Sequence, residues 1–101
     1  MRSDYSETAS QAAVIYGDFL QTRDGSVWLR AYDILTNEQI GRDFLYLGDM
    51  VDSNPVSAPF AIKFDPTKFP NVRTVNNIVI DVIQDSESYP FQGQVHILFN
   101  K

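Results

Sequence analysis

Hydrophobic and polar residues alternate along most of the chain, and residues 58–66 show this pattern most clearly. Phe60, Ile62 and Phe64 are separated by single residues, which gives a period of two. That period is typical of a β-strand with one buried face. A proline stands near each end of the segment, where a residue without an N–H interrupts strand pairing. The segment therefore predicts a strand over residues 60–64.

The same alternation predicts further strands, separated by turn residues such as Gly, Pro, Asn and Asp. Gly17 is a candidate β-bulge. The Asp24-Gly25 pair predicts a hairpin between the first two strands, because glycine tolerates the positive φ of such turns. Residues 48–57 have the composition of a loop. We expect the other strands over residues 12–20, 26–35, 39–47, 75–84 and 93–99.

Strands at intervals of about 8–15 residues, without a helical period between them, indicate an all-β fold. We expect an antiparallel β-sandwich of about seven strands in an Ig-like or transthyretin-like layout, with a small barrel as the alternative. A length of 101 residues suits a single domain. We assign residues 11–101 to this domain and residues 1–10, which are polar and aperiodic, to a flexible leader.

Charge and composition exclude several classes of function. The formal net charge is −5 and the eight basic residues form no cluster, so we expect no nucleic-acid partner. The chain has no cysteine, and therefore neither disulfides nor thiolate ligands for zinc. No apolar run reaches the roughly 20 residues that a transmembrane helix needs. The polar N-terminus lacks the apolar core of a signal peptide, which leaves a cytosolic protein or one whose leader has been removed.

Few residues have the types and spacing that metal binding or catalysis requires. His96 is the only histidine. The alternation places it on the outward side of its strand, so we expect a surface residue and not a base or ligand. Asp49, Asp52 and Asn54 bring oxygen atoms close together in the long loop and form a candidate calcium site. Their role as turn-forming residues explains the same pattern more simply.

Asp33 and Asp81 each lie in the middle of a predicted strand. If the fold brought them together, two carboxylates could perform acid–base chemistry. The alternative that we favour is that each points to solvent from the outer side of its own strand. The sequence contains no nucleophile elbow, glycine-rich phosphate loop or zinc-binding helix motif. We therefore predict a protein that is not an enzyme and takes no cofactor.

Trp28, Arg30 and Tyr32 share one side of the predicted strand 26–35, and the opposite side is also apolar. If they are exposed, they form a recognition patch, because Trp, Tyr and Arg predominate in binding hot spots. Exposed rings would equally suit stacking on a sugar. The alternative that we favour places Trp28 between the two sheets, since sandwich cores often contain a tryptophan.

The first and last predicted strands offer a different mode of binding. If either of them, over residues 11–16 or 93–99, lies at the edge of a sheet, its backbone can pair with a strand of a partner. The sequence contains nothing that marks such an edge as used.

Two segments resemble the YbaY/YscW group of small bacterial outer-membrane lipoproteins, which includes type III secretion pilotins. Residues 27–33 (Val-Trp-Leu-Arg-Ala-Tyr-Asp) resemble the strand motif Val-x-Val-x-Leu-x-Asp of that group. Residues 59–66 (Pro-Phe-Ala-Ile-Lys-Phe-Asp-Pro) resemble its segment Pro-Phe-x-Φ-x-Φ-Asp-Pro. The resemblance covers about residues 12–100. The chain departs from the group in lacking the lipidation cysteine and in the asparagine-rich stretch 72–77.

The resemblance implies a periplasmic β-sandwich that acts as a chaperone or assembly factor for another protein. Membrane association would then require a lipidated leader that has been removed. We predict a non-enzymatic domain that binds a protein partner, with Trp28, Arg30 and Tyr32 as the contact residues. The alternative is a carbohydrate- or ligand-binding module, for example an accessory domain of a larger extracellular protein.

Overall fold

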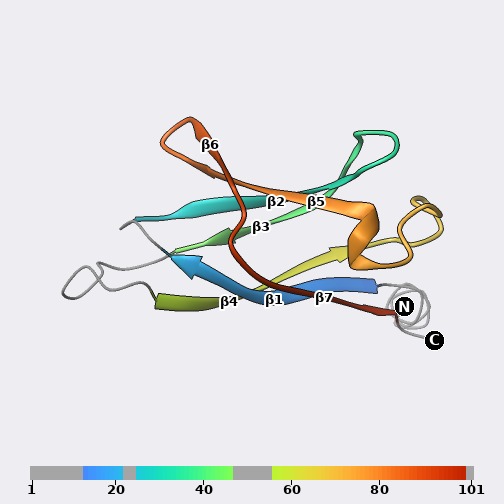
Figure 1. Cartoon of the computed structure of the whole chain (residues 1–101), viewed down its shortest axis with the longest axis horizontal. Coiled ribbons are helices and arrows are strands. Elements are labelled where there is room, and N and C mark those ends of the chain that lie inside the picture. Colours follow the sequence, from blue (N-terminus) through green and yellow to red (C-terminus); the bar gives the residue numbers. More distant parts are fainter. Residues whose placement is uncertain (1–12, 22–24, 47–55, 100–101) are drawn as a thin grey trace, which may run out of the picture.

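The predicted β-sandwich is confirmed. The computed structural model describes residues 13–21, 25–46 and 56–99. Two antiparallel sheets pack face to face (Figure 1), sheet A in the order β4-β1-β7 and sheet B in the order β3-β2-β5-β6. The elements are β1 (Ala13–Gln21), β2 (Val27–Asp33), β3 (Gln39–Leu45), β4 (Val56–Phe64), the 3₁₀ turn η2 (Val75–Asn77), β5 (Ile78–Gln84), β6 (Glu87–Pro90) and β7 (Gly93–Phe99).

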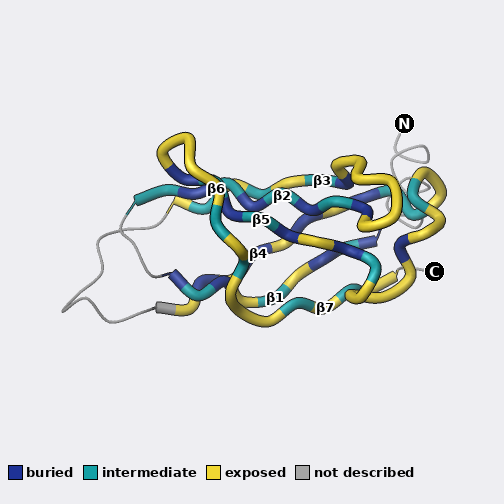
Figure 2. Tube along the Cα trace, turned by 45° about the horizontal axis from the view of Figure 1, so that its top comes forward, coloured by how far each residue is buried: buried dark blue, intermediate teal, exposed yellow. Residues whose placement is uncertain are grey.

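The core lies between the sheets and is built from alternate residues of each strand. Ile15 and Ile62 are opposite each other on β1 and β4 of sheet A, and both are fully buried. Leu29 of β2 is equally buried and belongs to the same cluster from the side of sheet B. Figure 2 shows buried positions alternating with more exposed ones along the strands. Each such side chain stabilises the fold by roughly 1.5–3 kcal/mol.

The hairpin predicted at Asp24-Gly25 is wrong. β1 lies in sheet A and β2 in sheet B, so the two strands are not paired. Both sides of β1 are already occupied, by β4 and by β7. β2 therefore begins in the other sheet, where its buried side faces the same core as the buried side of β1.

Gly17 does not form the predicted bulge. The pairing of β1 with β4 and with β7 continues through Gly17 without a shift in register. The glycine is required for another reason. Its φ is +156°, and a Cβ atom at this position would overlap the backbone carbonyl of Gln94 on β7. Glycine therefore allows the two strands to approach closely where a side chain would separate them.

Two segments differ from the expected strand boundaries. β4 begins at Val56, so Pro59 lies inside the strand; β4 is at the end of sheet A, where a missing N–H is tolerated. Val75–Asn77 forms the 3₁₀ turn that leads into β5. The side chain of Asn77 accepts hydrogen bonds from the N–H groups of Arg73 (2.9 Å) and Thr74 (3.0 Å). Asparagine in this stretch thus caps the turn.

β6 is a strand that the alternation did not predict. It pairs with β5 through a turn whose two central residues, Asp85 and Ser86, have φ of 54° and 68°. Two positive φ values define the type I′ turn that joins twisted strands tightly. After Pro90 the chain leaves sheet B and crosses to sheet A. Phe91 fills the space at this crossing and contacts the rings of Phe19 (5.9 Å) and Phe60 (5.4 Å).

Candidate binding face

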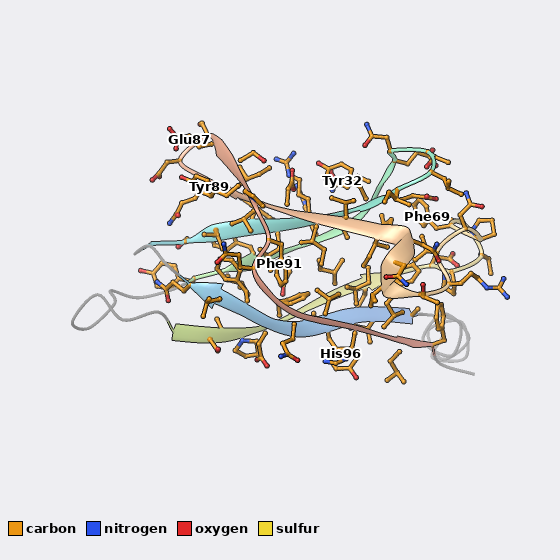
Figure 3. The ribbon with its side chains drawn as sticks, in the orientation of Figure 1. Tyr32, Phe69, Glu87, Tyr89, Phe91 and His96 are labelled. Carbon is orange, nitrogen blue, oxygen red and sulfur yellow. The ribbon has the colours of Figure 1, made fainter. Side chains whose placement is uncertain are left out.

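β2 has a buried side and an outer side. Trp28, Arg30 and Tyr32 are half-buried on the outer side, and in Figure 3 Tyr32 points away from sheet A. The expectation that Trp28 lies between the sheets is therefore wrong. That space is filled by the alternate residues of the same strand, which are almost completely buried: Val27, Leu29 and Ala31. Small and branched side chains fill that space, and the indole is left on the outer surface.

Residues of β3 and β5 complete the surface around these three side chains, because opposite residues of paired strands share a face. We call this surface the Trp28 face. Its exposed apolar members include Phe44, which is 47% exposed, and Val79, which is 46% exposed. The face consists of three rows across sheet B: Phe44–Trp28–Ile83, Arg42–Arg30–Asp81 and Tyr32–Val79.

Three side chains at the β3 side of this face are packed together. The ring of Phe44 lies against the indole of Trp28, with centroids 4.8 Å apart and planes inclined at 53°. The guanidinium of Arg42 lies over the same indole, 4.7 Å from its centroid. A cation over an aromatic ring at this distance is attracted by the ring's quadrupole. These contacts hold large side chains in place on an open surface, which lowers the entropy that a partner would have to remove on binding.

The central row carries opposed charges. Arg30 and Arg42 are directly opposite each other on neighbouring strands, an arrangement that destabilises a sheet through repulsion. The indole beneath Arg42 and the carboxylate of Asp81, opposite Arg30 on the other side, offset this repulsion. Asp81 accepts a hydrogen bond at Oδ2 from the Ser88 hydroxyl at 3.4 Å, while its buried Oδ1 has no hydrogen-bond partner. The row thus has two guanidinium groups at one end and, at the other, a carboxylate with one oxygen that accepts no hydrogen bond.

A shallow hollow lies on the β6 side of Trp28, beside the turn between β5 and β6. Its walls include Arg30 and Ile83, and the turn contributes the carboxylates of Asp85 and Glu87. The Trp28 face is therefore basic toward β3 and acidic toward β6. A partner with the complementary arrangement of charges would bind this face in one orientation.

The two candidate acid–base residues are not brought together. Asp33 belongs to the buried side of β2, and Asp81 lies on the outer side of sheet B. The expectation that Asp33 points to solvent is wrong, because it is only 1% exposed. Its carboxylate accepts hydrogen bonds from the Leu35 N–H (2.9 Å) and the Asn71 side-chain amide (3.4 Å). Asp33 thus stabilises the turn after β2.

His96 lies on the outer side of β7, as predicted. It is exposed, and Figure 3 shows it on the side of sheet A that faces away from sheet B. Its ring lies 5.3 Å from that of Tyr16 on the paired strand β1. The contact is one between surface rings on neighbouring strands, far from the Trp28 face on the other sheet.

The candidate calcium residues Asp49, Asp52 and Asn54 lie outside the described residues. Within the part of the chain that the structure describes, no three His, Cys, Asp or Glu side chains are grouped so that they could hold a metal ion. No helical segment among the same residues is long and apolar enough to cross a bilayer.

Comparison with known proteins identifies no relative. No protein-family model, curated protein or solved structure matches the chain. The resemblance to the YbaY/YscW group rests on the two sequence segments alone and stays a prediction.

Sequence reasoning named three members of the Trp28 face and missed the others, among them Arg42 and Phe44. Their signal was present, because Arg42 and Phe44 are two residues apart and therefore share one side of β3. What the sequence did not provide was the register that places this side next to Trp28. A hairpin register counted back from Tyr32 and Gln39 would have placed Asp43 opposite Trp28, because an irregularity between Ala31 and Tyr32 shifts the pairing by one residue.

Proposed function

We propose that this domain is a non-enzymatic β-sandwich that binds another protein through the Trp28 face. One observation carries the proposal. Arg30 and Arg42 are held opposite each other, beside a tryptophan and an exposed phenylalanine. Trp, Tyr and Arg are the residue types on which binding energy most often depends. The indole and Asp81 offset the repulsion between the two arginines within the sheet, and an anionic group of a partner would offset it further.

The charges on this face indicate the chemistry of the partner. The chain as a whole is acidic, with a net charge of −5, so most of its surface repels carboxylates. Arg30 and Arg42 form a local exception. The guanidinium groups of such a pair bind carboxylates through parallel hydrogen bonds. We therefore expect the partner to place an Asp or Glu over the arginines and an apolar group beside Phe44.

The finer part of the proposal is a role as a periplasmic chaperone or assembly factor. Its support is the resemblance of residues 27–33 and 59–66 to segments of the YbaY/YscW group. Residues 27–33 form β2, so the strand that carries this resemblance also carries Trp28, Arg30 and Tyr32.

Binding of a sugar is the competing proposal, and the geometry of Trp28 disfavours it. A sugar ring stacks on an open aromatic face. The guanidinium of Arg42 already lies over the indole, and Phe44 meets it at an angle of 53° and so does not extend it into a flat platform. A protein surface can meet an angular, charged patch of this kind more readily than a sugar ring can.

Photo-cross-linking in cells of the source organism tests the proposal. A benzophenone amino acid at Phe44 samples the Trp28 face, and the same amino acid at Lys63 samples the outer side of sheet A; both positions are exposed. We expect a discrete protein adduct from position 44 and none of that mass from position 63. The adduct should be lost when Arg30 and Arg42 are both replaced by alanine. A glycan array probed with the wild type and with Trp28→Ala forms the second arm.

The outcomes separate the alternatives. An adduct that forms equally well from position 63, or that survives removal of both arginines, would show that the Trp28 face is not the contact surface. Glycan binding that is lost in Trp28→Ala would replace the protein partner by a sugar. Circular dichroism of each variant confirms the fold, which we expect to be retained because the changed side chains are not part of the core.

A further inference from the structure

The sandwich has four outer strands, and two of them protect each other. β3 ends sheet B and β4 ends sheet A on the same side of the molecule (Figure 1). The carboxylate of Asp43 on β3 accepts a hydrogen bond from the N–H of Ala61 on β4 at 2.9 Å. A Cβ atom on Gly41 would come within 2.7 Å of the Ile62 side chain and 2.9 Å of the Lys63 carbonyl. The close approach of these strands leaves little room for a foreign strand.

The third outer strand, β6, is protected by its length and composition. It has only four residues, carries Glu87 at its start and ends at Pro90. Short strands, charges and proline are the usual means by which proteins prevent pairing at a sheet edge. β6 therefore offers an incoming strand few backbone groups.

β7, the fourth outer strand, has none of these protections. Its seven residues, Gly-Gln-Val-His-Ile-Leu-Phe, include no proline and no Asp, Glu, Lys or Arg. Among the described residues, β1 is its only paired neighbour, and no described strand pairs with its other side. A long uncharged edge of this kind is the usual template for pairing with another chain.

The inner side of β7 is also incompletely covered. Val95 and Ile97 are half-buried and Phe99 is 38% exposed. The equivalent residues of the neighbouring strand β1 are buried, with Ala13 1% and Ile15 0% exposed. An apolar hollow extends from Val95 to the start of β5, where β6 no longer covers the sheet. The inner side chains of β7 are thus only partly covered by the opposite sheet.

The backbone of β7 has hydrogen-bonding groups on the side that points away from β1. The N–H of Leu20 donates to the carbonyl of Gln92 at 2.9 Å, and this pair continues the register of β1 and β7. Because the direction of backbone groups alternates along a strand, the N–H and C=O groups of Val95, Ile97 and Phe99 point away from β1. They are positioned to form a ladder with another strand.

We infer that β7 pairs in antiparallel fashion with β7 of a second copy of this chain, joining two three-stranded sheets into one of six strands. A two-fold axis at His96 pairs all seven residues of each strand. It places Val95 opposite Ile97 of the second copy on the inner side, so that each covers the other's exposed apolar surface. His96 then lies opposite its own counterpart on the outer side.

Symmetry favours a second copy over a foreign strand, and the lack of charge on β7 permits it. Two chains with net charge −5 repel each other in general, and β7 is a described strand that brings no charge into the contact. Selective binding of a foreign strand would need charged side chains on the edge that match charges of the partner, and β7 has none. With its own copy, the two-fold axis sets the register and matches apolar residues to apolar residues.

The absence of cysteine makes the register directly testable. In the proposed dimer the two copies of residue 96 form a non-hydrogen-bonded pair, whose Cα atoms lie about 4.5 Å apart and are within reach of a disulfide. His96→Cys should therefore yield a disulfide-linked dimer under mild oxidation. Leu98→Cys, two residues along the same side, and Ser57→Cys, on β4, serve as exposed controls and should stay monomeric on a non-reducing gel.

Sedimentation velocity over a concentration series tests the association itself. We expect a reversible monomer–dimer equilibrium for the wild type, and a dissociation constant raised roughly tenfold or more by His96→Glu, which opposes two carboxylates at the axis. Ser57→Glu adds the same charge at the far edge of the sheet and should leave the constant unchanged. A wild type that stays monomeric at every concentration would overturn the inference. A dimer whose dissociation constant is unchanged by His96→Glu would also overturn it. So would a disulfide-linked dimer that forms through Cys at position 57 or 98.

Discussion

The carboxylate of Asp43 on β3 accepts a hydrogen bond from the backbone N–H of Ala61 on β4, at 2.9 Å. The two residues belong to different sheets, so this bond joins the sheets along one side of the sandwich. Asp43 acts in place of the backbone carbonyl that a further strand would supply to β4. The opposite side, where β7 ends sheet A, has no such side-chain cap among the described contacts.

Replacing Asp43 by alanine should lower the free energy of unfolding by about 1 kcal/mol, because the bond is exposed and water replaces part of it. Asp43→Asn keeps an acceptor oxygen and should cost less. Urea denaturation of both variants measures the difference, and hydrogen exchange of the Ala61 amide should accelerate in Asp43→Ala alone. Equal exchange rates in the two variants would show that the carboxylate does not protect this amide.

Gly41→Ala should destabilise the same side of the sandwich by about 1–3 kcal/mol, the usual cost of forcing extra volume into a packed contact. The added methyl group would lie 2.7 Å from Ile62 and 2.9 Å from the Lys63 carbonyl. Adding Ile62→Val should not recover the loss, because valine keeps the Cγ2 atom that the new methyl group would meet. A thermal melt follows both variants, and full recovery in the double variant would place the clash elsewhere.

Asp33→Ala should cost about 1.5–3 kcal/mol, the usual loss for a hydrogen bond to a charged group. The buried carboxylate accepts from the Leu35 N–H and from Asn71, so the turn after β2 loses its connection to the distant segment 65–74. Asn71→Ala removes only the longer of the two bonds and should cost less. Chemical denaturation ranks the variants, and a larger loss in Asn71→Ala would reverse our assignment of the main bond.

Asp65 should titrate below its ordinary pKa of 3.8. The Thr67 hydroxyl donates to the carboxylate at 2.7 Å and the Thr67 N–H at 2.9 Å, and these bonds, the hydroxyl first, favour the charged form and lower the pKa of Asp65. A lowered pKa in the folded state contributes stability above the ordinary pKa, and this contribution disappears as the pH falls through the lowered value.

Thr67→Ala removes the larger of these causes and keeps the backbone bond. The pKa of Asp65 should therefore move back toward, but not reach, its ordinary value. Carboxyl carbon chemical shifts followed by NMR from neutral to acid pH measure both proteins. An identical midpoint in the wild type and in Thr67→Ala would mean that the hydroxyl does not stabilise the carboxylate.

Alternation predicted the strands from the sequence because one buried face imposes a period of two, and it located most of β2, β3, β5 and β7 within a few residues. It could not choose between the two sides of β2, because Trp28 and Leu29 are both apolar. Which side faces inward depends on what packs opposite, and here Ile15 and Ile62 of sheet A fill the centre together with Leu29.

Pairing partners were harder to predict than strands. The Asp24-Gly25 signal indicated a turn, but a turn does not state whether the next strand joins the same sheet. The short strand β6 could not be predicted because its sequence lacks a clear apolar alternation. Its position depends instead on the I′ turn and on the packing of Tyr89 against the core. The Trp28 face could therefore be suspected from three residues of one strand, whereas Arg42 and Phe44 required the register of the sheet.

Fluorescence quenching of Trp28 tests most directly whether the aromatic side of β2 is open to a partner. The chain has a single tryptophan, so the whole indole signal comes from this face. We predict that acrylamide quenches the native protein measurably, and that Arg42→Ala increases the quenching by removing the guanidinium that lies 4.7 Å above the ring. Emission typical of a buried indole, unaffected by acrylamide in both proteins, would place Trp28 inside the sandwich and contradict the account.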